Sequence, residues 1–145
     1  MFNKETEYAL RSLVYIQCQN NQGLRPGIEE IATAAEAPQS FTAKILQRLV
    51  RIGFINSIKG KGGGFYFEKD KPDLPLKELI VAIEGDSLFN KCGFGMKNCN
   101  CENPCPIHND YGVIRDGIEK LVTDETIQSL SNKLSKDVFL LDFQI

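Results

Sequence analysis

The chain has 145 residues, of which 42% are hydrophobic and 25% are charged, and its formal net charge is -2. A chain of this length can bury one core and has little left for an independent second domain, so we expect one globular domain with an appendage. Its apolar runs are only a few residues long and its start is not basic, which predicts neither a secreted nor a membrane-spanning protein.

The first half of the chain has the pattern of three helices. Residues 5–19 place apolar side chains at helical spacing, with Glu5 and Glu7 in the first turn, where the helix dipole favours acids. Residues 28–35 are rich in alanine and predict a short second helix. A third helix is expected to begin near Ser40, a suitable N-cap, and to end at Gly53.

The third helix and the segment after it are basic. Residues 40–67 contain five lysines and arginines and no acidic residue, although the chain as a whole is slightly acidic. Residues 54–59 and 65–68 have strand-forming side chains and flank a glycine-rich turn, so they predict a hairpin with a basic tip.

Three helices followed by a hairpin are the parts of a winged helix-turn-helix domain, in which the third helix enters the major groove of DNA and the hairpin contacts its flank. The expected fold class is therefore mainly α with a small β-hairpin wing and a long C-terminal dimerisation helix. Lysines at the wing would contact the DNA backbone or the minor groove, and residues in the first turns of the third helix would face base edges. The candidate DNA-binding residues are Gln39, Ser40, Phe41, Thr42, Lys44, Gln47, Arg48, Arg51, Lys59 and Lys61.

The second half of the chain begins with a further helical stripe, which follows Pro75 and stops at Gly85. Residues 86–106 lose all periodicity, so something other than hydrophobic packing must order them. Apolar side chains then recur at spacings of four and three from Ile107 to Leu121, the pattern of a helix that meets another helix in a homodimer. Thr123 and the two acids after it predict a new helix start.

These patterns divide the chain into three parts. Residues 1–85 form the DNA-binding domain, 86–108 a cysteine-rich loop, and 109–145 the dimerisation helix and tail. We assign no role to the apolar tail, residues 138–145.

The cysteine-rich loop contains the candidate metal ligands of this sequence. Four of the five cysteines and the single histidine fall in it, and without a secretion signal we expect a cytoplasmic protein whose thiols stay reduced and bind a metal. The candidate ligands are Cys92, Cys99, Cys105 and His108, with Cys101 as a further candidate. This spacing indicates a metal but does not separate zinc from iron and sulfur. Cys18 is far from the loop in sequence and is expected to be a buried apolar residue.

Several short motifs together resemble the Rrf-two (Rrf2) family of bacterial regulators, over essentially residues 1–122. They are Glu7-Tyr8-Ala9-Leu10-Arg11, the run at 49–55, the turn at 59–65, Ile83-Glu84-Gly85 and the cysteine loop. The resemblance implies that Cys92, Cys99, Cys105 and His108 hold a 2Fe-2S cluster, as in IscR-like members, with a 4Fe-4S cluster as the alternative. In this chain the first cysteine gap is one residue longer and Cys101 is an extra thiol. NsrR-like members use a carboxylate of the partner's first helix, which makes Glu7 a further candidate ligand.

The sequence therefore predicts a DNA-binding transcriptional regulator, not an enzyme, whose promoter binding is controlled by an iron–sulfur cluster. A homodimer would place its two third helices in successive major grooves about 34 Å apart, on a pseudo-palindromic site of double-stranded DNA. One alternative is a cluster-free regulator that uses zinc or the oxidation of Cys99 and Cys101. Another is a winged-helix module that acts through a protein partner. An enzyme with Cys105 as nucleophile and His108 as base is not expected, because the sequence offers no recognisable residue to orient the pair.

Overall fold

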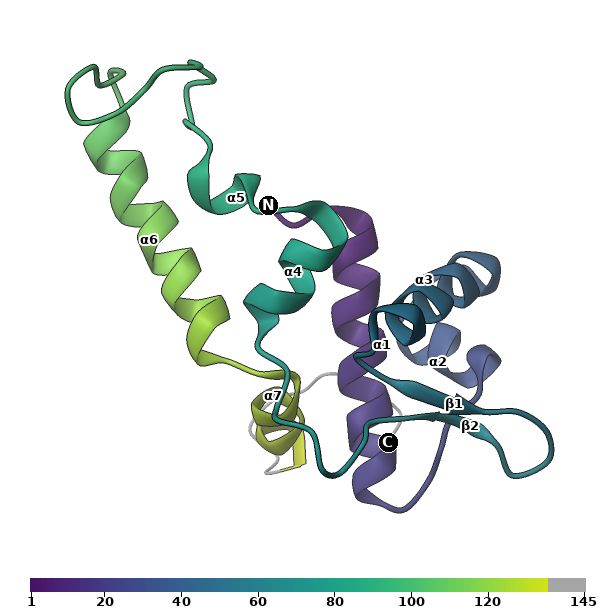
Figure 1. Ribbon diagram of the computed structural model, residues 1–145. Helices are drawn as coiled ribbons and strands as arrows, with labels where there is room; N and C mark the ends of the chain where they lie inside the picture. Colours follow the sequence, from purple (N-terminus) through teal and green to yellow (C-terminus); the bar gives the residue numbers. More distant parts are fainter. Residues whose placement is uncertain (136–145) are drawn as a thin grey trace. The chain divides into compact units, whose positions relative to one another are not determined.

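A computed structural model describes residues 1–135, and Figure 1 shows its elements in chain order. The apolar tail, residues 138–145, lies outside the described residues. The elements are α1 (Lys4–Asn21), α2 (Ile28–Ala34), α3 (Gln39–Ile52), β1 (Asn56–Ile58), β2 (Gly64–Tyr66), α4 (Leu76–Glu84), α5 (Ser87–Asn90), α6 (His108–Asp124) and α7 (Ile127–Ser135).

These elements form two compact units. The first unit contains Met1–Leu74 and the described residues from Thr126 onward, and the second unit contains Pro75–Glu125. Helix α4 therefore belongs to the same unit as α6. A hydrophobic stripe shows that a face is buried, but it does not show which partner buries it.

The core of the first unit is built on α1. Asn3 caps this helix, because its Oδ1 accepts a hydrogen bond from the N–H of Thr6 at 2.8 Å. Fully buried side chains on α1, α2 and α3 face one another, which explains the apolar periodicity of all three helices. They include Leu13, Ile31, Leu46 and Leu49.

Helix α7 packs against α1 and completes this core with Ile127, which is fully buried. Thr126 and Ser129 cap its start reciprocally, since each N–H donates to the hydroxyl of the other residue. The new helix was expected nearer Thr123, but α6 continues through Asp124 and the cap lies two residues further on.

The hairpin is tied to α1 by Asn20. Its side-chain amide donates to the carbonyl of Phe65 at 3.2 Å and its oxygen accepts from the N–H of Phe67 at 2.8 Å. The strands pair antiparallel with Ser57 opposite Phe65, and they are shorter than the two predicted runs. At Gly64 an added Cβ would lie 2.2 Å from the carbonyl oxygen of Arg25, so the close approach of these two segments requires glycine. The winged helix-turn-helix fold is confirmed.

In the second unit α4 and α5 contact α6. Leu79 and Ile80 of α4 and Val122 of α6 are fully buried, and Lys77 Nζ lies 2.5 Å from Glu119 Oε1. Helix α5 was not predicted, because a four-residue turn has no periodicity to detect.

Candidate metal centre and nucleic-acid interface

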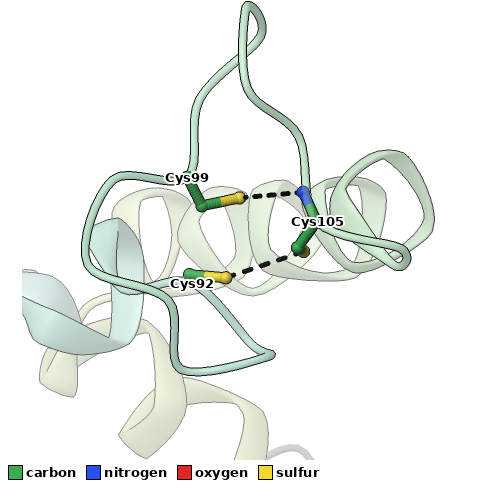
Figure 2. Close-up of side chains that lie close together, drawn as sticks. All are labelled: Cys92, Cys99 and Cys105. Atoms are coloured by element: carbon green, nitrogen blue, oxygen red, sulfur yellow. Dashed lines mark hydrogen bonds between the residues drawn. The ribbon is translucent and has the colours of Figure 1, made fainter.

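Three of the predicted ligands converge in the loop of the second unit. The Sγ atoms of Cys92, Cys99 and Cys105 all lie within 4.8 Å of one another. Cys92 Sγ and Cys105 Sγ are 3.6 Å apart, and Figure 2 shows the three side chains pointing toward one another from separate stretches of the loop. Cys105 is buried and the other two are half-buried.

Backbone N–H groups are directed at two of these sulfurs. The N–H of Cys105 donates to Cys99 Sγ at 3.4 Å (Figure 2), and the backbone N–H groups of Met96 and Phe94 lower the pKa of Cys92. Donors of this kind favour a thiolate, the form of cysteine that binds metals. Sequence reasoning did not find Phe94 and Met96, because a backbone donor has no side-chain signature.

The thiols differ in how readily they ionise. Desolvation raises the pKa of Cys92, but the N–H groups of Met96 and Phe94 and the thiols of Cys99 and Cys105 outweigh it and lower this pKa from 9.0 to about 7. The Cys105 N–H lowers the pKa of Cys99, but desolvation and the adjacent Cys92 and Cys105 thiols outweigh this donor, so the pKa of Cys99 is raised.

His108 contacts one of the three sulfurs and lies between Cys99 and Cys101 in its two ring contacts. His108 is the first residue of α6; its Nδ1 is 3.1 Å from Cys99 Sγ and its Nε2 is 4.0 Å from Cys101 Sγ. Cys101 is exposed and sits in a tight turn organised by Asn100, whose Oδ1 accepts from the N–H of Asn103 at 2.9 Å. The structure thus brings Cys99, and not Cys101, together with Cys92 and Cys105.

The donor set fits a four-coordinate metal centre. Metal–sulfur bonds of about 2.3 Å at tetrahedral angles place two sulfurs about 3.8 Å apart, close to the 3.6 Å between Cys92 and Cys105. His108 lies outside the group of three converging sulfurs but contacts Cys99, which makes it the candidate fourth ligand. Three thiols and one imidazole suit both zinc and iron–sulfur centres. The remaining candidate, Glu7, belongs to the first unit, where it pairs with Lys4 at 3.4 Å.

The second candidate surface is the exposed side of α3 in the first unit. Its members are polar or basic and project away from the buried face of the helix. They are Gln39, Ser40, Lys44, Gln47 and Arg51. Phe41 is 40% exposed and meets the Tyr8 ring edge-on, with ring centroids 5.6 Å apart.

Two predicted residues of α3 have different surroundings. Thr42 is fully buried, and its hydroxyl donates to the carbonyl of Pro38 at 3.0 Å, which satisfies it inside the fold. This position differs from the base-facing one expected from sequence. Arg48 is half-buried and pairs with Glu5 at 2.9 Å.

A groove separates α3 from the wing. It has a volume of about 650 Å3 and its lining includes Gln47, Arg51, Lys59 and Gly60. Lys61 is exposed at the tip of the wing. Basic groups therefore flank this groove on both the helix and the hairpin.

No helix among residues 1–135 combines the length and the apolar character needed to cross a membrane.

Known proteins similar to this chain are regulators. NsrR, an HTH-type transcriptional regulator of Bacillus subtilis, is 29% identical over 97 residues, which are 64% of this chain and 63% of the relative. IscR of Photorhabdus laumondii, also an HTH-type transcriptional regulator, is 22% identical over 125 residues, 86% of this chain and 75% of the relative.

Solved structures share the fold. CymR, described as the global cysteine regulator of B. subtilis, has a TM-score of 0.70 at 16% identity and covers 91% of this chain and 96% of its own. IscR of T. potens also has a TM-score of 0.70, at 13% identity, over 96% of this chain and 91% of its own.

A family model described as "Iron-dependent Transcriptional regulator" matches residues 2–133, nearly the whole described chain. The protein therefore belongs to the Rrf2 family of transcriptional regulators and is not an enzyme.

Proposed function

We propose that this regulator binds promoter DNA under the control of an iron–sulfur cluster held by Cys92, Cys99, Cys105 and His108. The observation that carries the proposal is the convergence of three thiols beside the first residue of α6. When bound, such a cluster supplies reversible electron transfer and a site that oxidants can attack. The four ligands suit a 2Fe-2S cluster, with a 4Fe-4S cluster as the alternative.

The ligand roles follow from the positions of the donors. Cys99 is proposed as the second cysteine ligand in place of Cys101, since its sulfur lies with those of Cys92 and Cys105. His108 would hold the loop to α6, because its imidazole already contacts Cys99 and it begins that helix. Reduced thiols are required for this role, which is consistent with a cytoplasmic protein.

We further propose that α6 joins two copies of the chain. Val113, Ile114 and Leu121 are 74%, 58% and 54% exposed, a row of large apolar side chains that a lone helix would leave in water. Ile114 and Leu121 belong to the spacing that predicts a helix–helix seam. A second copy of α6 would bury this face and relate the two DNA-binding units by symmetry.

In the dimer, α3 of each copy would enter a major groove of a pseudo-palindromic site, the grooves being about 34 Å apart. Gln39, Ser40 and Lys44 occupy its first turns and are assigned to base edges, whereas Arg51, Lys59 and Lys61 are assigned to phosphates. Gln47, Arg48 and Phe41 complete the proposed surface. Thr42 is left out, because its side chain is buried.

A second candidate function is a cluster-free thiol switch. Cys92 Sγ and Cys105 Sγ are 3.6 Å apart, so loss of two electrons and two protons to a peroxide would join them in a disulfide. This pair is better supported than Cys99 and Cys101. Zinc bound by the same thiols is the corresponding metal alternative.

Anaerobic purification followed by iron, sulfide and zinc analysis and a visible spectrum tests the proposal. Iron and sulfide near stoichiometry, with promoter affinity that changes when they are removed, would support cluster control. Zinc alone, or a reversible disulfide that changes promoter affinity, would contradict the cluster and support the second candidate function. Promoter binding that does not weaken with salt would contradict phosphate contacts by α3 and the wing.

A further inference from the structure

One face of α6 is directed at the cysteine loop. His108, Tyr111 and Arg115 are spaced by three and four residues and so lie in one row along the helix. His108 Nδ1 is 3.1 Å from Cys99 Sγ, and Arg115 Nη1 donates to the carbonyl of Lys91 at 3.4 Å. Between these two contacts, the ring of Tyr111 lies directly against Gly93, the residue after Cys92.

The contact between Gly93 and Tyr111 has no room for a side chain at position 93. An added Cβ would lie 2.5 Å from Tyr111 Cδ2 and 2.6 Å from both its Cε2 and its Cγ. Rotation of the ring about its own axis leaves Cγ in place, so it cannot relieve this clash. The φ of Gly93 is outside the left-handed region, which means that glycine is needed here for close approach and not for backbone conformation.

The ring, and not the hydroxyl, makes this contact. Tyr111 is half-buried, and within residues 1–135 its hydroxyl makes no hydrogen bond. Just beyond the contact, the N–H of Gly95 donates to the carbonyl of Cys92 at 3.0 Å, which closes a backbone turn that begins at Cys92. The Tyr111 ring therefore supports the segment that carries the Cys92 sulfur and the N–H donors aimed at it.

We infer that Tyr111 is a positioning residue: its ring, seated on Gly93, holds the Cys92 segment against α6 and so couples the order of the metal loop to this helix. The inference rests on the proposed function in taking Cys92 as a ligand. Tyr111 lies two residues before Val113 and three before Ile114, so a shift of the loop would move the helix turn that also carries these two exposed apolar side chains. Residues that orient a metal ligand without touching the metal typically change affinity by about tenfold to a hundredfold when replaced.

The test compares Gly93→Ala, Tyr111→Ala, Tyr111→Phe and the double variant Gly93→Ala with Tyr111→Ala. Gly117→Ala is the matched control, because the same change on α6 meets nothing within 4 Å. The first measurement is hydrogen exchange of residues 91–95 in metal-free full-length protein, read by mass spectrometry. The second is the rate at which anaerobically loaded protein loses metal to a chelator, with circular dichroism to verify folding.

In the metal-free protein, Gly93→Ala and Tyr111→Ala are expected to speed exchange of residues 91–95 by about tenfold, and both should speed metal loss by about tenfold to a hundredfold. Tyr111→Phe and Gly117→Ala should match the unmodified chain. In the double variant the two changes should not add, because Gly93→Ala acts only by displacing the ring. If Tyr111→Ala does not fold, the difference in exchange rate between Gly93→Ala and Gly117→Ala tests the inference.

Additive effects in the double variant would overturn the inference. So would a Tyr111→Phe protein as mobile as Tyr111→Ala, or exchange in Gly93→Ala no faster than in Gly117→Ala. The outcomes are separable from the proposed function. If the unmodified protein binds no metal, cluster control fails, whereas the exchange data on metal-free protein still decide whether Tyr111 positions the loop.

Discussion

Helix α3 and the cysteine loop, residues 91–107, are held in shape by different forces. Four residues of α3 are buried, among them Leu46 and Leu49, so hydrophobic burial determines the helix. Among residues 91–107 of the loop, Cys105 alone is buried, while Phe94 and Met96 are 58% and 40% exposed. Hydrogen bonds to sulfur and a tight turn shape the loop, which therefore depends on its thiols.

This difference indicates which segment of the regulator a metal or an oxidant can affect. A surface built on a buried core keeps its form under changes of redox state or metal supply, which is what the role proposed for α3 requires. A loop with little apolar burial gains most of its order from what binds it, because a ligand stabilises the state that it binds.

The sharpest test of this contrast is Leu46→Ala in α3. Leu46 is fully buried, so its truncation should lower the free energy of unfolding by about 2–5 kcal/mol, which chemical denaturation followed by circular dichroism measures. Lys44→Ala, on the exposed face of the same helix, should change that free energy by less than about 0.5 kcal/mol. Equal losses in the two variants would show that burial does not determine α3.

Removing a thiol from the loop should abolish metal binding without unfolding the protein. Cys105→Ala is expected to abolish the visible absorbance and the bound iron while leaving the helix content and the dimer intact, as iron analysis, circular dichroism and gel filtration would show. Cys18→Ala is the control, since Cys18 is buried in α1 and belongs to the other unit. A coloured, iron-containing Cys105→Ala protein would contradict the proposed ligand set.

On the proposed DNA-binding surface, the removal of a single positive charge should weaken promoter binding by a limited amount. Arg51→Ala and Lys59→Ala should each weaken promoter binding, and each loss of a phosphate contact should reduce the slope of affinity against salt by about 1. Lys120→Ala, an exposed change on α6, should leave the slope unchanged. Titrations at several salt concentrations measure this, and unchanged slopes for both test variants would remove α3 and the wing from the interface.

The smallest expected effect is a difference in thiol reactivity. The pKa of Cys92 is lowered to about 7, whereas desolvation by burial raises the pKa of Cys18. In metal-free protein, alkylation of Cys92 by iodoacetamide should therefore rise with pH around 7, while Cys18 stays slow beyond pH 9. Mass spectrometry of the labelled peptides measures both rates, and equal rates would mean that the N–H groups near Cys92 do not stabilise its thiolate.

The same shift has a defined sign for stability. The pKa of Cys92 is lower in the folded loop than its ordinary value of 9.0. The contribution of the Cys92 thiolate to the stability of the fold is therefore fully present above pH 9.0 and is lost as the pH falls through about 7.

Much of the winged helix-turn-helix could be predicted from sequence, because its signals are local. Apolar spacing locates α1, α2 and α3 within a few residues, and the glycines at 60–64 mark the wing. Thr42 shows the limit of this reasoning. As a polar residue beside the exposed face of α3 it was assigned to DNA, yet its hydroxyl bonds to Pro38 one turn earlier, which lets it be buried.

The candidate metal site was predictable in composition but not in arrangement. Clustered cysteines and a histidine indicate metal chemistry, whereas the turn that carries Cys101 away from the three converging sulfurs depends on Asn100 and its backbone partners. Nothing in the spacing of the cysteines distinguishes Cys99 from Cys101.

By itself, the sequence determined the order of the helices, the basic hairpin and the presence of a cysteine loop, since each depends on neighbours within one or two turns of chain. Only the tertiary structure decided that α7 packs against α1, that Cys99 joins Cys92 and Cys105, and that Gly93 accepts the ring of Tyr111. These contacts join residues that are not neighbours within any one helix or strand. Their geometry arises from packing, which periodicity and composition do not encode.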